Sequence, residues 1–206
     1  MQHSAHIFKF CAQQKSKNMK KIAIFASGEG SNAERIASYF LEKETINVEL
    51  IITNKVDAGV LKRVESLGIP TLFLTSQELQ GEKLVQILKQ YEIDFIVLAG
   101  YLAKISEEIL TLFPNRIINI HPSLLPKYGG KGMYGLKVHK AVLDAKEKES
   151  GITIHYIDKE YDKGIVILQA KCPIMEGDTP ESLAERVHQL EYKYYPETIE
   201  KILTHL

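Results

Sequence analysis

The chain alternates short apolar runs with segments of helical periodicity, and this alternation constrains its fold more than any other feature. Strand-length apolar runs cover 21–26, 48–53, 70–74, 93–99 and 116–120. Between them, 33–42, 59–67 and 81–91 carry apolar residues at helical spacing, and a further helix is expected between Ser106 and Pro114. Strands separated by helices pair in parallel through right-handed crossovers. The pattern predicts an α/β protein with a Rossmann-like, three-layer fold around a mostly parallel twisted sheet.

The second half of the chain departs from this order. The stretch 122–135 is rich in Pro and Gly, and a helix is predicted over 136–145. Strands predicted at 151–157 and 164–172 leave no room for a crossover helix, so we expect antiparallel strands at the C-terminal side of the sheet. A closing helix is predicted over 181–195.

Composition and charge narrow the function classes. Hydrophobic residues make up 45% and charged residues 25% of the 206 residues, as is usual for a globular protein. Lys and Arg number 26, as do Asp and Glu, and the net charge of +0 disfavours a nucleic-acid-binding protein. No apolar run is long enough to span a membrane. Cys11 and Cys172 are too few for a disulfide framework or a four-ligand zinc site, which favours a cytoplasmic location.

The first 18 residues differ in composition from the rest of the chain. They contain lysines but no acidic residue, and Lys9 interrupts their apolar run, so they lack the pattern of a secretory signal. Met19 directly precedes the first predicted strand and is the expected natural start. We predict that 1–18 is a disordered N-terminal extension, with a short ordered arm as the alternative, and that 19–206 forms one domain.

A glycine-rich turn, SGEGSN at 27–32, separates the first predicted strand from the first predicted helix. Glycine lets the backbone approach a ligand closely, and a helix start presents free N–H groups to an anion. The turn lacks the Gly-Lys-Ser/Thr of a P-loop, and its match to the dinucleotide fingerprint is weak. It predicts a monophosphate site, with a tight turn capped by a Ser or Asn side chain as the alternative.

Asn119 and His121 end a predicted strand and lie on the same face of it. The carboxyl edge of such a sheet is where ligands bind. An amide and an imidazole at one spot can hydrogen-bond a carbonyl oxygen and relay a proton. Two further polar segments are the loop 158–164 and the helical stretch 188–191. Taken alone, the loop is more typical of a solvated hairpin turn and the helical stretch of a solvated helix face.

Four segments follow one another along the chain: FASGEGSN at 25–32, VLAGY at 97–101, NIHPSLLP at 119–126 and DKG at 162–164. In their order and spacing they resemble the folate-dependent formyltransferase family. NIHPSLLP resembles the formyl-transfer motif, and SGEGSN points to the phosphoribosylglycinamide formyltransferases. The resemblance covers 19–206 and implies formyl transfer from 10-formyltetrahydrofolate to the amine of glycinamide ribonucleotide, in de novo purine biosynthesis and without a metal.

The resemblance also implies the residues of the site. The catalytic trio would be Asn119, His121 and Asp162, with Asn119 and His121 stabilising an oxyanion and Asp162 keeping His121 protonated. The ribonucleotide would contact Gly30, Ser31, Asn32, His188, Gln189, Leu190 and Glu191. The folate would contact Leu102, Ala103, Lys104, Ile105, Asn119, Asp158, Lys159, Glu160, Tyr161 and Asp162. A cis peptide bond is implied before Pro126.

Alternatives to this function remain open. The same trio could transfer a formyl group to methionyl-tRNA or to an amino-sugar nucleotide, although the net charge of +0 disfavours a transfer-RNA substrate. With water as the acceptor it would act as a formyl-folate hydrolase. A non-catalytic nucleotide-binding module would use the glycine-rich turn alone. We expect only small-molecule partners, with no nucleic acid and no membrane, and a monomer or homodimer.

Overall fold

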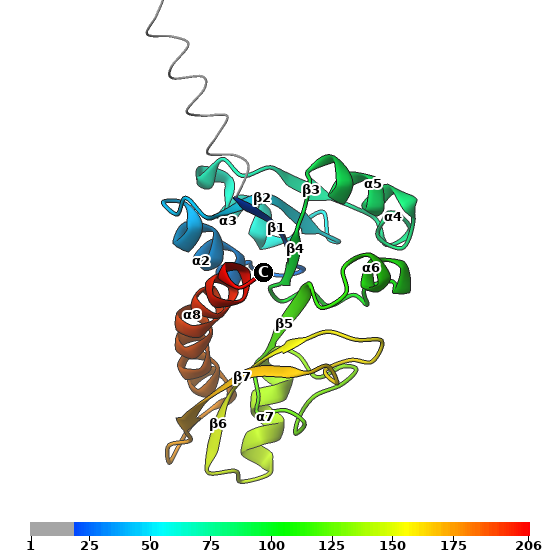
Figure 1. Cartoon of the computed structure of the whole chain (residues 1–206). Helices are drawn as coiled ribbons and strands as arrows, with labels where there is room; N and C mark the ends of the chain where they lie inside the picture. Colours follow the sequence, from blue (N-terminus) through cyan, green and yellow to red (C-terminus); the bar gives the residue numbers. More distant parts are fainter. Residues whose placement is uncertain (1–18) are drawn as a thin grey trace, which may run out of the picture.

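The structure, a computed structural model, describes residues 19–206, so the predictions for 1–18 and Cys11 lie outside the described residues. The order of elements agrees with the predicted alternation (Figure 1). The elements are β1 (Lys20–Phe25), α2 (Ser31–Phe40), β2 (Ile46–Thr53), α3 (Gly59–Arg63), the 3₁₀ helix η1 (Glu65–Leu67), β3 (Thr71–Phe73), α4 (Ser76–Leu79), α5 (Glu82–Gln90), β4 (Phe95–Leu98), α6 (Glu107–Leu112), β5 (Ile117–His121), α7 (Leu136–Asp144), β6 (Glu149–Tyr156), β7 (Val166–Pro173) and α8 (Pro180–Thr204).

The strands form one seven-stranded sheet in the order β3-β2-β1-β4-β5-β6-β7. The pairs from β3 to β5 are all parallel, whereas β6 is antiparallel to β5 and β7 is antiparallel to β6. This arrangement confirms the predicted Rossmann-like fold with antiparallel strands at its C-terminal side. Parallel strands bring their carboxyl ends to one edge, so β1, β4 and β5 end together beside the loops that follow them.

Each face of the sheet has its own apolar core. Ile24 belongs to a cluster of buried residues that includes side chains of α2, α7 and α8, and the adjacent Phe25 belongs to a second cluster that includes side chains of α4, α5 and α6. This is the alternation expected of neighbouring strand residues. The two groups of helices lie on opposite sides of the sheet in Figure 1, which completes the three layers.

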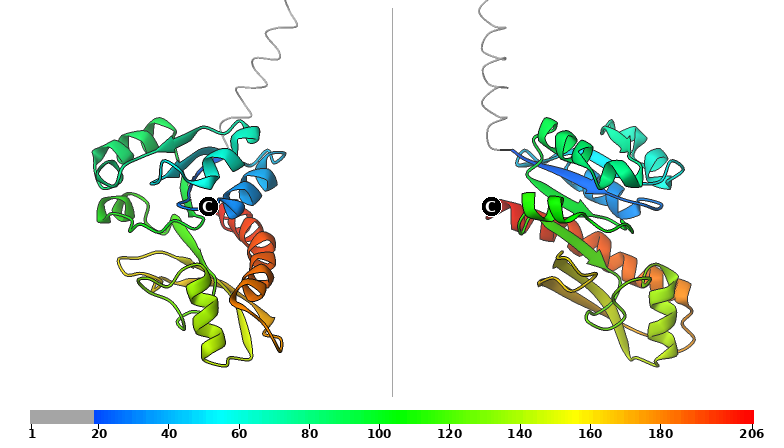
Figure 2. Two further views of the ribbon diagram at one scale, coloured as in Figure 1. Left: turned by 180° about the vertical axis from the view of Figure 1, so that it is seen from behind. Right: turned by 90° about the vertical axis from the view of Figure 1, so that its right-hand side faces the viewer.

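Helix α8 extends further than its sequence pattern predicts. The prediction ended it at Tyr195, but α8 continues to Thr204 through Pro196, which cannot donate a helical hydrogen bond. Tyr195 is fully buried, and its hydroxyl lies 2.9 Å from the carbonyl oxygen of Leu98 on β4. Ile199 is also fully buried, so tertiary packing outweighs the local cost of the proline. In Figure 2, α8 runs along one face of the sheet, in contact with α2 and α7.

Other helix boundaries differ locally from the prediction. The segment 59–67 divides into α3 and η1 rather than forming one helix, and Gly68 ends it with a φ of 66° as expected. The short helix α4 was not predicted, although Thr75 and Glu78 form a capping box at its start. Ser106 caps α6 as predicted, accepting a hydrogen bond from the amide of Ile109.

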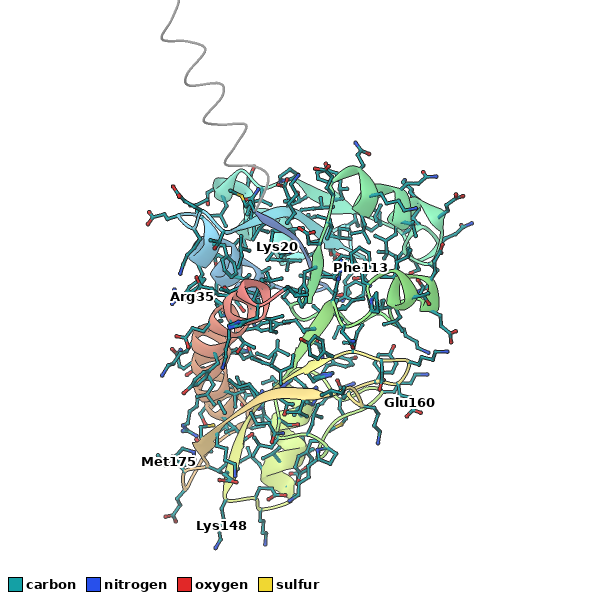
Figure 3. The ribbon with its side chains drawn as sticks, in the orientation of Figure 1. Lys20, Arg35, Phe113, Lys148, Glu160 and Met175 are labelled. Carbon is teal, nitrogen blue, oxygen red and sulfur yellow. The ribbon has the colours of Figure 1, made fainter. Side chains whose placement is uncertain are left out.

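The C-terminal hairpin of β6 and β7 extends the sheet beyond its parallel part. Glu160, on the loop between these strands, and Met175, beyond β7, lie at opposite ends of the hairpin (Figure 3). The loop that bears Glu160 follows the end of β6 that pairs with β5. Within 19–206, no helix combines the length and the apolar character needed to cross a membrane.

Candidate active site

A cavity of about 660 Å³ opens at the carboxyl edge of the sheet. Its walls come from the loops after β1 and β4, the end of β5, the glycine-rich stretch 130–135, the loop between β6 and β7, and α8. Its volume lies within the range of roughly 300–1,000 Å³ that is typical of small-molecule sites. A second cavity of about 60 Å³ shares Tyr101, Asn119, Tyr161 and Asp162 with the first. The two cavities are therefore neighbours with a common wall.

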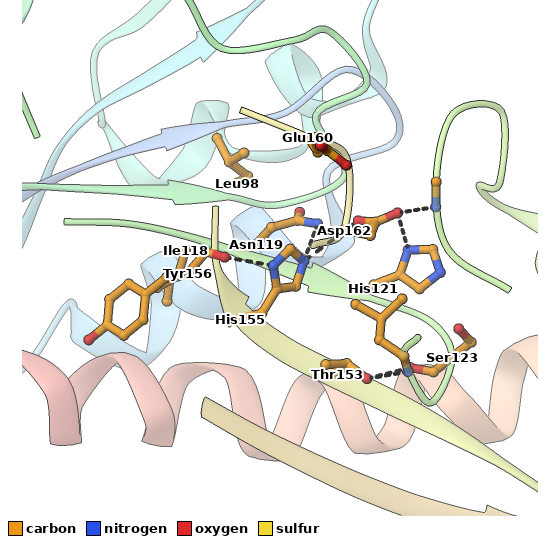
Figure 4. A network of polar contacts seen from close by, with 12 residues as sticks. Leu98, Ile118, Asn119, His121, Ser123, Thr153, His155, Tyr156, Glu160 and Asp162 are labelled. Atoms are coloured by element: carbon orange, nitrogen blue, oxygen red, sulfur yellow. Dashed lines mark hydrogen bonds and ion pairs between the residues drawn. The ribbon is translucent and has the colours of Figure 1, made fainter. Parts of the chain in front are cut away.

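The structure brings Asn119, His121 and Asp162 together in the larger cavity, and Asn119 and Asp162 also line the smaller one (Figure 4). Asn119 and His121 lie on β5, and Asp162 lies on the loop between β6 and β7. His121 Nδ1 is 3.5 Å from Asp162 Oδ2, and the amide of Gly130 donates to the same carboxylate oxygen at 2.8 Å. The predicted trio is thus a spatial cluster, although His121 and Asp162 lie 41 positions apart in the sequence.

The surroundings of His121 fix which ring nitrogen carries its hydrogen. His121 Nε2 lies 2.8 Å from the carbonyl oxygen of Tyr128, which can only accept, so Nε2 donates. Burial lowers the pKa of His121, while the Asp162 carboxylate and the Tyr128 carbonyl act in the opposite direction. Asp162 therefore favours the protonated ring as predicted, but burial outweighs it.

Asp162 stays ionised despite its partial burial. Burial alone would raise its pKa, but His155, His121 and the amide of Gly130 together hold the pKa below the usual value. A carboxylate is therefore present beside His121 at neutral pH, where it can accept a proton.

His155 is a residue of this cluster that the sequence did not predict. Its Nδ1 lies 2.8 Å from the carbonyl oxygen of Tyr156, so Nδ1 donates, and its Nε2 lies 3.2 Å from Asn119 Nδ2. The same Nε2 is 3.6 Å from Asp162 Oδ1. The only signal in the sequence is the alternation of polar Thr153 and His155 along a strand predicted to lie beside the parallel sheet.

The glycine-rich turn lies at the start of α2, which begins at Ser31 and not at 33. Gly30 is the N-cap with a φ of 77°, and no side chain of the described residues caps the helix, so the alternative of a Ser or Asn cap is wrong. A Cβ on Gly30 would lie 2.5 Å from Val60 Cβ, which is too close for any other residue. The first N–H groups of α2 have no partner within the helix and can bind an anion.

Asn32 connects this turn to α8. Asn32 Nδ2 donates to Glu191 Oε2 at 2.8 Å, and Asn32 Oδ1 is buried with no hydrogen-bond partner in the part of the chain that the structure describes. Glu191 is only 5% exposed, so it does not lie on a solvated helix face. Burial raises the pKa of Glu191, while Asn32 and His188 act in the opposite direction.

The remaining predicted residues separate into lining and non-lining groups. Of the predicted ribonucleotide residues, Gly30, Ser31, Asn32, His188 and Glu191 line the larger cavity, whereas Gln189 and Leu190 line neither of the two cavities described above. Of the predicted folate residues, Leu102 lines the larger cavity, Asn119, Tyr161 and Asp162 line both, and Ala103, Lys104, Ile105, Asp158, Lys159 and Glu160 line the smaller one. The peptide bond between Leu125 and Pro126 is cis, as the resemblance implied.

His139 on α7 also lines the larger cavity and was not predicted. It is 2% exposed, and its Nδ1 has no hydrogen-bond partner among residues 19–206. Burial, followed by the charges of His188 and His121, lowers the pKa of His139 to about 4. The ring is therefore neutral at physiological pH. In the same described range, no group of His, Cys, Asp and Glu side chains is arranged to hold a metal ion.

Comparison with known proteins finds relatives that share one name. A phosphoribosylglycinamide formyltransferase of Bacillus subtilis is 36% identical over 90% of this chain and 95% of its own length. The chloroplastic phosphoribosylglycinamide formyltransferase of Arabidopsis thaliana is 44% identical over 87% of this chain, which spans 64% of that relative's length. The crystal structure of phosphoribosylglycinamide formyltransferase from Anaplasma phagocytophilum superposes with a TM-score of 0.83 at 33% identity, covering 91% of this chain and 88% of that one. Residues 20–199 match the formyl transferase family, and the chain belongs to that family.

Proposed function

We propose that this protein transfers the formyl group of 10-formyltetrahydrofolate to the amine of glycinamide ribonucleotide, as a phosphoribosylglycinamide formyltransferase of de novo purine biosynthesis. The observation that carries the proposal is the meeting of Asn119, His121 and Asp162 in the larger cavity, next to the smaller one that Asn119 and Asp162 also line. Two substrates bound on either side of this trio would present their reacting atoms to it. The relatives with the same name support this choice of substrates.

In this proposal Asn119 stabilises the negative charge that develops on the formyl oxygen. When the amine attacks the formyl carbon, the formyl oxygen becomes an oxyanion that needs hydrogen-bond donors. One N–H of the Asn119 amide is directed at His155 Nε2, which leaves the second N–H for the substrate. Because His155 fixes the amide, the donor is oriented before the reaction begins.

His121 and Asp162 complete the proton transfer. The amine loses a proton as its bond to the formyl carbon forms, and the folate nitrogen gains one as its bond to that carbon breaks. The ionised Asp162 accepts the first proton and passes it, through His121 Nδ1 or a bound water, to the folate nitrogen. No covalent enzyme intermediate is required.

The ribonucleotide phosphate would bind at the start of α2. The free N–H groups of Gly30, Ser31 and Asn32 and the positive end of this ten-residue helix suit a dianionic group. The buried Glu191 lies across the cavity wall from Asn32 and can accept hydrogen bonds from sugar hydroxyls or from the substrate amine. Binding of the phosphate at this end of the cavity, away from the trio, would orient the amine for attack.

The experiment is an assay with both substrates, following the change in folate absorbance. We expect turnover that requires glycinamide ribonucleotide, and no formate release when that acceptor is left out. Formate release without an acceptor would indicate a formyl-folate hydrolase, and no turnover with both substrates would contradict the proposal. Inactivity of Asp162→Asn is the control for a contaminating enzyme. We also propose a cytoplasmic location and a monomer or homodimer, although the Arabidopsis relative is named chloroplastic.

A further inference from the structure

Tyr128 has an unusual backbone conformation directly beside the catalytic cluster. Its φ is 57°, in the left-handed region that a side chain with a Cβ rarely adopts. In this conformation its carbonyl oxygen lies 2.8 Å from His121 Nε2. Two residues later, the amide of Gly130 donates to Asp162 Oδ2. One short segment therefore contacts both members of the His121–Asp162 pair.

The side chain of Tyr128 is attached to a second element. Its hydroxyl donates to Glu147 Oε1 at 2.8 Å, and Lys127 Nζ lies 2.7 Å from the same oxygen. Glu147 follows α7 and precedes β6, so it is part of the folded frame and not of the glycine-rich stretch. The Glu147 carboxylate is charged, because Lys127 and the Tyr128 hydroxyl lower its pKa. A hydrogen bond to a charged acceptor is stronger than a neutral one.

We propose that Glu147 and Tyr128 are positioning residues for the formyl transfer, holding the imidazole of His121 with Nε2 on the Tyr128 carbonyl and Nδ1 toward Asp162. Glu147 restrains the Tyr128 ring, the ring restrains the left-handed backbone, and the backbone carbonyl fixes His121. The role in catalysis rests on the proposed function, whereas the effect on the His121 ring does not.

The charge state of His121 supplies a readout that a merely structural role would not change. The groups that face His121 are Asp162 and His155 from β6 and its loop, and His139 from α7. The Tyr128 carbonyl favours the protonated ring, because it accepts a hydrogen bond from Nε2. Loosening that carbonyl while the other groups stay in place lowers the pKa of His121.

The test compares Tyr128→Phe and Glu147→Ala with two matched controls. Glu147→Gln keeps an acceptor for the Tyr128 hydroxyl and is the rescue variant. Lys127→Met removes the other partner of Glu147 and leaves the Tyr128 contact intact. The pKa of His121 is measured by NMR titration of its ring nitrogens in the substrate-free protein, and kcat and KM are measured with both substrates.

We expect Tyr128→Phe and Glu147→Ala to lower the pKa of His121 and to reduce kcat by about tenfold with little change in either KM, since a displaced acid–base group loses part of its usual contribution. Glu147→Gln and Lys127→Met should resemble the wild type. An unchanged His121 titration in Glu147→Ala would overturn the proposal, and so would equal losses in Lys127→Met. If Tyr128→Phe does not fold, the comparison of Glu147→Ala with Glu147→Gln is the deciding test. The titration needs no turnover, so absent activity in the wild type would contradict the proposed function and leave this test standing.

Discussion

Asn119 and His155 occupy paired positions in the antiparallel register of β5 and β6, and their side chains meet with Asn119 Nδ2 3.2 Å from His155 Nε2. The carbonyl of Tyr156 accepts a hydrogen bond from the other nitrogen of the ring, so in the neutral form of the ring the nitrogen that faces Asn119 carries a lone pair. A lone pair there requires the amide nitrogen, and not the amide oxygen, to face His155. The antiparallel pairing of β6 with β5 thus determines how the Asn119 side chain faces the cavity.

Substitution of His155 tests this relationship. In His155→Phe the Asn119 amide loses its acceptor and can rotate, so the oxyanion donor is no longer oriented. Complete loss of such a donor costs roughly 10²–10³ in kcat, and we expect a smaller loss of about tenfold or more because Asn119 itself remains. Steady-state kinetics should show the loss in kcat with both KM values nearly unchanged. A loss confined to KM would contradict the orienting role.

Asp162→Asn separates the chemical step from binding. The amide keeps the size of the carboxylate but cannot accept a proton or favour the protonated His121. We expect kcat to fall by roughly two to four orders of magnitude, the usual contribution of a positioned acid–base group. Dissociation constants for both substrates should stay near normal. A variant with more than about a tenth of the wild-type kcat would indicate that Asp162 only stabilises its loop, where its φ is 57° and Asn is equally well tolerated.

Asn32→Asp tests the ribonucleotide end of the cavity. The new carboxylate would face the phosphate and would also lie against the buried Glu191, which Asn32 now contacts at 2.8 Å. Both effects disfavour a dianionic ligand, so the KM for glycinamide ribonucleotide should rise more than about tenfold while the folate KM is unchanged.

The double variant Asn32→Asp with Glu191→Gln separates these two effects. Glutamine leaves no carboxyl group at position 191 to share its surroundings with a carboxylate at position 32, but the repulsion between position 32 and the phosphate stays. The KM for the ribonucleotide should therefore recover only in part. Equal rises in the KM of both substrates would mean that the turn does not bind the ribonucleotide.

Local patterns in the sequence predicted the sheet and part of the candidate site, and particular residues show why. Alternation along one strand places Asn119 and His121 on a common face without any knowledge of partners. His155 could not be predicted in the same way, because its contact with Asn119 depends on the register between β5 and β6. In the sequence, Glu191 resembles a residue on a solvated helix face. Its burial follows only from the packing of α8 against the start of α2.

The left-handed conformation of Tyr128 could not be predicted from the sequence either. Its sequence context, KYGG at 127–130, predicts only a turn, whereas the value of φ depends on contacts to His121 and Glu147. The extent of α8 shows the same principle, since Pro196 would end an isolated helix but the burial of Tyr195 and Ile199 keeps it continuous.

The last prediction concerns stability and pH at His139. The folded protein lowers the pKa of this ring to about 4, whereas the unfolded chain has the ordinary value near 6.5. Between these values the unfolded state binds more protons, so the contribution of His139 to stability is fully present above pH 6.5 and is lost as the pH falls toward 4. His121, whose pKa is also lowered, contributes in the same direction. In His139→Leu the free energy of unfolding should decline less steeply with falling pH over this window. The difference in slope corresponds to the uptake of up to about one proton on unfolding. Denaturant unfolding at several pH values measures that slope, with His205→Gln, at an exposed position near the end of α8, as the matched control. A slope identical to that of the wild type would mean that His139 binds its proton at the same pH in the folded and the unfolded chain, and the lowered pKa assigned to this ring would be wrong.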